Sequence, residues 1–185
     1  PPADLPDGPV LDHDVALVLR GLRDRDAAIG SRACLAVEKI APQQLFQPED
    51  MPSLWEGLRP KLRSADADTG EWSARALAAL ARHTDLLAGE MPGEALDETL
   101  RLVSSDDSDW RRRGAVIACG LVRILSEDEV ETLVRGLLAD RPGAGPETMA
   151  IRALGRAAPH IASSALADDV ATRLRAVTAG VPAGA

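Results

Sequence analysis

An internal repeat constrains the fold of this chain more than any other feature. Four arginines follow one another at intervals of about 40 residues. A large apolar residue stands three positions before each arginine, and a small residue comes directly after it. The repeated arginines are Arg32, Arg75, Arg113 and Arg152. The large apolar residues before them are Ile29, Trp72, Trp110 and Met149, and the small residues after them are Ala33, Ala76, Gly114 and Ala153. Because three positions carry the same kind of residue in all four copies, the sequence indicates one structural unit repeated along the chain.

Each copy also contains an amphipathic helix upstream of its arginine. In the first copy the apolar residues are Val15, Val18, Leu19 and Leu22, which is the i, i+3, i+4, i+7 spacing of one buried helical stripe. No segment alternates with the period of two that a strand requires. Aromatic residues make up only 2% of the chain, although 45% of it is hydrophobic, which favours closely packed helices built from small aliphatic side chains. The prediction is an all-α protein of stacked helix pairs.

Local signals mark where the predicted helices begin and bend. Ser126 followed by Glu129 has the form of a capping box. Ser163 is expected to cap the last helix rather than to act as a nucleophile. Pro60 lies inside a predicted helix and is expected to kink it.

The repeat resembles the HEAT family of helical repeats. The stretch Asp107-Ser108-Asp109-Trp110-Arg111-Arg112-Arg113-Gly114-Ala115 is similar to the HEAT pattern of an Asp-rich turn, an apolar residue with Arg, and small residues opening the second helix. The resemblance covers about 12–179 and implies a right-handed α-α superhelix, or solenoid, of about four HEAT-like helix pairs with a C-terminal capping helix. The expected repeats are 12–41, 51–84, 94–125 and 127–161, with the capping helix at 164–179, all in one domain over 12–180. Residues 1–11 are expected to be disordered or extended, and 181–185 to form a tail.

The resemblance also implies structural roles for the repeated residues. In HEAT proteins the equivalent Asp and Arg residues form hydrogen-bond ladders between repeats. On that analogy a structural ladder would join Arg32, Arg75, Arg113 and Arg152 to turn carbonyls or to acids such as Asp26, Asp107 and Asp109. The four large apolar residues of the repeat, Ile29, Trp72, Trp110 and Met149, are expected to be core anchors.

The chain offers little catalytic or metal-binding chemistry. His83 and His160 occupy the same repeat position two copies apart, which separates them too far for a shared metal ion. The same separation excludes a disulfide between Cys34 and Cys119, each of which lies in an apolar stretch and is expected to be buried. We therefore expect a non-enzymatic protein with no cofactor and no metal ion.

The basic residues are concentrated in the second helix of each predicted pair. Those four helices carry ten basic and three acidic residues, whereas the whole chain has a formal net charge of −8. Second helices line the concave face of HEAT-like arrays, so the resemblance implies a basic groove. Without the four repeated arginines, the groove residues are Lys39, Arg82, Arg111, Arg112, Arg123 and Arg156. Whether these cations form a binding site or simply a solvated face is left open by charge patterning alone.

Two functions are compatible with a basic groove. The first is a scaffold or protein–protein interaction module that binds an acidic peptide or helix of a partner protein, since guanidinium groups suit carboxylates. The second is nucleic-acid binding, because Trp110-Arg111-Arg112 resembles a stretch of the HEAT-like DNA alkylation-repair glycosylases; the acidic net charge makes this less favoured. A third interpretation is a structural segment of a longer solenoid. No apolar run is long enough to span a bilayer, and a cytoplasmic location is expected.

Overall fold

A computed structural model describes residues 12–83, 91–139 and 148–179 of the chain. Throughout these ranges the structure consists of helices and their connections, with no strand. The predicted all-α, helical-repeat fold is therefore confirmed. The chain divides into two compact units, 1–88 and 89–185, and each is described separately below.

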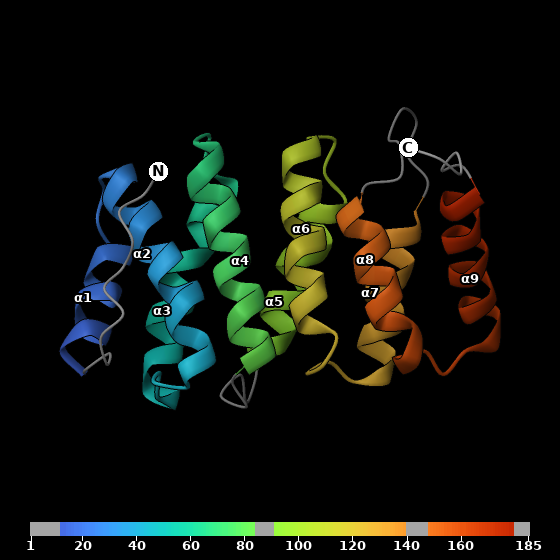
Figure 1. The fold of residues 1–185 in the computed structure, drawn as a ribbon, viewed down its shortest axis with the longest axis horizontal. Coiled ribbons are helices and arrows are strands. Elements are labelled where there is room, and N and C mark those ends of the chain that lie inside the picture. The colour runs from blue at the N-terminus through green and yellow to red at the C-terminus, as the bar shows by residue number, and fades with distance from the viewer. Residues whose placement is uncertain (1–11, 84–90, 140–147, 180–185) are drawn as a thin grey trace. The chain divides into compact units, whose positions relative to one another are not determined.

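The first unit contains two stacked helix pairs (Figure 1). Its α-helices are α1 (Asp12–Leu22), α2 (Ala27–Ile40), α3 (Met51–Leu58) and α4 (Ala67–His83), and its 3-10 helices are η1 (Ala41–Gln43), η2 (Pro48–Asp50) and η3 (Arg59–Arg63). Helix α4 packs along α2, and α3 packs on α1. The α1–α3 contact is close because α3 carries a glycine there: a β-carbon on Gly57 would lie 2.7 Å from Cβ of Leu22. Each of the main core side chains is at most 2% exposed. They include Leu22, Val37, Phe46, Leu54, Leu58, Leu62 and Leu80.

Pro60 changes the type of helix rather than bending one continuous helix. The α-helix α3 ends at Leu58, and the 3-10 helix η3 begins at Arg59 with Pro60 in its first turn. Proline has no N–H and its ring clashes with the carbonyl four residues earlier, so the α-helical ladder cannot pass through it. The tighter 3-10 geometry continues the chain as far as Arg63.

The second unit repeats the same arrangement and adds a final helix (Figure 1). Its elements are α5 (Met91–Val103), α6 (Ser108–Leu121), α7 (Glu127–Leu138), α8 (Thr148–Ala157), the 3-10 helix η4 (Ala158–His160) and α9 (Ser164–Ala179). Helix α8 packs on α6, α7 packs on α5, and α9 contacts both α7 and α8. One continuous cluster of buried residues, including Ala118, Val130, Leu133, Leu154 and Leu166, joins these helices.

The two helix caps predicted in the second unit, at Ser126 and Ser163, are confirmed, whereas α5 starts at Met91 rather than at residue 94. The Ser126 hydroxyl accepts a hydrogen bond from the backbone N–H of Glu129, and the Glu129 carboxylate accepts one from the N–H of Ser126. The Ser163 hydroxyl accepts from the N–H of Leu166 at the start of α9. None of the helices in the described ranges combines the length and apolarity needed to cross a membrane.

Candidate interaction surface

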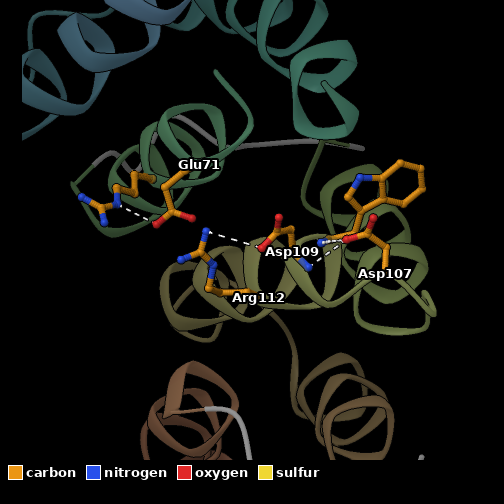
Figure 2. Close-up of polar contacts among 6 residues, drawn as sticks. Glu71, Asp107, Asp109 and Arg112 are labelled. Carbon is orange, nitrogen blue, oxygen red and sulfur yellow. Dashed lines mark hydrogen bonds and ion pairs between the residues drawn. The ribbon is translucent and has the colours of Figure 1, made fainter. Parts of the chain in front are cut away.

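A recurring turn starts the second helix of three of the pairs. Asp26 precedes α2 and accepts hydrogen bonds from the N–H groups of Ala28 and Ile29, at 2.8 and 3.2 Å. Asp107 precedes α6 and accepts in the same way from the N–H groups of Asp109 and Trp110, at 2.8 and 3.0 Å (Figure 2). These carboxylates satisfy backbone donors that would otherwise lack a partner in the first helical turn.

The residue two positions before each capping aspartate completes the turn. Asp24 accepts from the N–H of Asp26, and Ser105 accepts from the N–H of Asp107. Before α4, Ser64 accepts from the N–H of Asp66, whose carboxylate then accepts from the N–H of Thr69 at 2.7 Å. The pattern Ser/Asp-x-Asp therefore recurs at 24–26, 64–66 and 105–107. The spacing of this turn is visible in the sequence. The predicted ladder between Asp26 or Asp107 and the repeated arginines is wrong, because both side chains cap their own helices.

Two of the repeated arginines, Arg32 and Arg75, do not form the expected ladder contacts. No described residue forms a hydrogen bond or ion pair with Arg32, which is exposed on α2. Arg75 bonds within its own helix, with its Nε 2.9 Å from Oε1 of Glu71 and its guanidinium 5.0 Å from the centre of the Trp72 ring. Its carboxylate partner is drawn in Figure 2. The predicted turn contacts of these two arginines are therefore wrong.

The other two repeated arginines differ from one another. Arg113 is buried in α6, with only 2% of its surface exposed. Arg152 is exposed on α8, where its Nη1 lies 3.9 Å from Sδ of Met149. The same repeat position thus presents its side chain to solvent in some copies and to the protein interior in another.

Two arginines assigned to the groove instead bond backbone carbonyls. Arg111 donates from Nη1 to the carbonyl oxygens of Ser105 and Asp106, at 3.1 and 2.8 Å, and so fastens the turn before α6. Arg156 on α8 donates to the carbonyl oxygen of Cys119 near the end of α6, at 2.9 Å. An arginine at the C-terminal end of a helix satisfies a carbonyl there and interacts favourably with the helix dipole. The structural role expected of the repeated arginines is therefore carried in part by Arg111 and Arg156.

The remaining groove residues lie at or near the protein surface. Lys39 is exposed on α2, and Arg82 is half-buried in the last turn of α4. Arg112 is exposed, with its Nη2 3.9 Å from Oδ1 of Asp109 on the same helix (Figure 2). Arg123 is exposed just after α6 ends. Arg32 and Lys39 are therefore exposed cations of α2 that form no hydrogen bond or ion pair with a described residue through their side chains.

The expected core anchors are less buried than predicted. Ile29 is 44% exposed, so its assignment as a core anchor is wrong. Trp72 and Trp110 are half-buried, and Met149 is a partly buried side chain packed against the core of the second unit. The apolar spacing of the repeat does not determine how far α2 is rotated against its neighbours, and in this copy the Ile29 side chain is left partly in solvent.

The described histidines differ from the cysteines in exposure. His83 and His160 are both exposed. The described residues contain no group of three or more His, Cys, Asp and Glu side chains that could hold a metal ion. Cys34 and Cys119 are buried free thiols. Burial raises the pKa of the Cys34 thiol to about 11, although the nearby Lys61 ammonium and a hydrogen bond with Ser73 act in the opposite direction.

Comparison with known proteins supports the fold alone. No protein-family model matches the chain, and no curated protein matches it. The chain is similar to two engineered proteins whose crystal structures were determined by the Northeast Structural Genomics Consortium. The first is 17% identical over 91% of this chain and 81% of its own, with a TM-score of 0.57. The second is 16% identical over 89% of this chain and 48% of its own, with a TM-score of 0.56.

Proposed function

We propose that this protein is a non-enzymatic, HEAT-like interaction module that binds an acidic segment of a partner protein. The observation that carries the proposal is the pair of exposed cations Arg32 and Lys39 on α2, which we call the α2 cation pair. Both side chains face solvent, and neither forms a hydrogen bond or ion pair with a described residue. An acidic ligand could contact them without displacing an internal partner.

The spacing of the α2 cation pair defines the ligand. Residues seven apart in a helix lie on the same face, separated by two turns, or about 10 Å along the axis. Two carboxylates at that separation occur in a helix with acids at i and i+7, and in an extended segment with acids three residues apart. The proposed ligand is therefore a short acidic segment rather than a single carboxylate.

Helix α4 packs beside α2 and provides further contacts for the same ligand. Arg75 is exposed there, and both its ion pair with Glu71 and its position over the Trp72 ring orient its guanidinium. An oriented guanidinium loses less side-chain entropy when it binds a carboxylate. Because Glu71 already offsets part of its charge, we assign Arg75 a supporting role.

The expected affinity is modest. An exposed ion pair contributes about 0.2–1 kcal/mol, so a few such contacts give weak, salt-sensitive binding with rapid exchange. Such binding suits a module that adds affinity to a larger assembly. We place this module in the cytoplasm, a location supported by its two free buried thiols.

The test compares two double variants that change the net charge equally. In Arg32→Glu with Lys39→Glu the α2 cation pair is reversed. In the control, Arg25→Glu with Arg63→Glu, two other exposed cations of the first unit are reversed. The probe is fluorescently labelled poly-L-glutamate, and the readout is fluorescence anisotropy at about 0.1 M salt, where the Debye length is about 10 Å.

We expect the first variant to abolish detectable binding and the control to retain most of it. Equal loss in both variants would show that binding follows net charge and would contradict the proposal. Labelled oligo-dT forms a second arm: tight binding of oligo-dT without binding of poly-L-glutamate would favour the nucleic-acid alternative. Reversing Arg111 and Arg112 is a poorer test because Arg111 bonds the turn before α6.

A further inference from the structure

The α2 cation pair has an apolar side chain between its two members. Leu35 stands three residues after Arg32 and four residues before Lys39, so all three lie on one face of α2, which we call the α2 stripe. The Leu35 side chain is half-buried, whereas the two cations beside it are exposed. A ligand that contacts both cations must therefore cross the exposed part of Leu35.

The conformation of a bound segment decides which of its side chains lies over Leu35. In polyproline II geometry, residues j and j+3 share a face about 9 Å apart, and the two residues between them point elsewhere. In a β-strand, j and j+3 point to opposite faces. In an α-helix, the residues at i+3 and i+4 lie between i and i+7 on one face. A helix can therefore cover Leu35 while two of its acids contact the cation pair.

Helix α2 also carries an acid beside the α2 stripe. Glu38 is half-buried, three residues after Leu35 and directly before Lys39. A ligand carboxylate placed over Leu35 would therefore lie near a like charge and would leave the leucine uncovered. An apolar ligand residue at that point avoids the repulsion and removes apolar surface from water. The charges and Leu35 together favour a ligand in which acids alternate with an apolar residue over one that is acidic throughout.

Resting on the proposed function, we infer that the partner segment is an amphipathic α-helix with acids at i and i+7 and a large aliphatic residue between them. The two acids pair with Arg32 and Lys39, and the aliphatic residue packs on Leu35. Because Leu35 is one residue closer to Arg32 than to Lys39, the aliphatic residue stands at i+3 in a helix parallel to α2. In an antiparallel helix it stands at i+4.

The first test uses the wild-type chain and three labelled, alanine-rich helical peptides of identical composition. Each carries two glutamates seven residues apart, and one leucine stands at i+3, at i+4 or at i+2 after the first glutamate. The leucine at i+2 lies on the opposite face of the helix, so this peptide is the matched control. We expect the i+3 or the i+4 peptide to bind about ten-fold more tightly than the control in fluorescence anisotropy, because its leucine is partly buried on Leu35.

The second test changes the protein. Leu35→Ala should weaken binding of the preferred peptide by about ten-fold and leave binding of poly-L-glutamate unchanged. Leu17→Ala, which removes an exposed leucine of α1, is the control and should change neither. Circular dichroism checks the fold of both variants, and the peptide series decides the question if Leu35→Ala unfolds.

The outcomes separate this inference from the proposed function. Equal affinities of the three peptides would overturn the helical ligand, even if binding of poly-L-glutamate still depended on the α2 cation pair. Absence of binding to both the peptides and poly-L-glutamate would overturn the proposed function as well.

Discussion

At Gly114, helix α6 packs closely against its partner α5. This glycine stands directly after a repeated arginine, where the other three copies carry alanine. A β-carbon here would lie 2.7 Å from Cγ1 of Val103 and 2.9 Å from the backbone nitrogen of Val103. Backbone atoms cannot move aside as a flexible side chain can. The size of the residue directly after the repeated arginine therefore depends on how closely the two helices of a pair approach each other. The α5–α6 pair requires glycine at this position.

Gly114→Ala should destabilise the protein by about 1–3 kcal/mol because it overpacks the α5–α6 contact. Gly155→Ala on α8 is the matched control, since no atom lies within 4 Å of the β-carbon it would add. In an open helical position alanine should stabilise by about 0.5–1 kcal/mol. The measurement is the free energy of unfolding by urea for each variant. Equal effects of the two substitutions would contradict the inferred close contact.

The thiol of Cys34 should make the stability depend on alkaline pH. Its pKa is raised from 9.0 to about 11 by burial in the folded state, so unfolding releases a proton between these values. The stabilising contribution is complete below about pH 9 and is lost as the pH rises toward 11. The loss should be on the order of 2 kcal/mol. Cys34→Ala should lack this part of the pH dependence, measured by urea unfolding across that range. Identical pH profiles of the two proteins would contradict the buried, protonated thiol.

At the scale of the element, each capped turn defines where a second helix starts. We expect Asp107→Ala to destabilise the protein by about 0.5–2 kcal/mol, since it leaves the N–H groups of Asp109 and Trp110 without their acceptor. The neighbouring Asp106→Ala removes an equally exposed carboxylate, and we expect it to change the stability by less than about 0.5 kcal/mol. Thermal unfolding of both variants provides the measurement. If Asp106→Ala had the larger effect, net charge rather than capping would control the start of α6.

The helices could be predicted from the sequence, whereas the contacts of the arginines could not. Hydrophobic periodicity indicates which residues of a helix face the core, and so it located α2 and α9 closely. It does not determine how far a helix rotates against its neighbour. In the run Arg111, Arg112 and Arg113, a rotation of one residue decides which side chain reaches the turn and which is buried. The exposure of Ile29 could not be predicted for the same reason, because its burial depends on how α2 is rotated against its neighbours.

At the scale of the whole molecule, the net charge of −8 opposes the binding of an acidic ligand at long range. At about 0.01 M salt the Debye length is about 30 Å, so the whole chain repels the ligand; at about 0.1 M it is about 10 Å, and the α2 cation pair dominates. At about 1 M both effects are screened. Binding of poly-L-glutamate should therefore be strongest at intermediate salt. An affinity that falls steadily from the lowest salt concentration would contradict this balance.

The Ser/Asp-x-Asp turn bears on how a chain of this kind can gain or lose length. Each of the bonds from the first to the third residue of the turn lies within one short segment, so α2, α4 and α6 each carry their own start signal. A duplicated segment would bring that signal with it, and a deleted one would leave the signals of the remaining helices intact. Tandem duplication of a segment that contains this turn can therefore lengthen the chain without redesigning the turns before α2, α4 and α6.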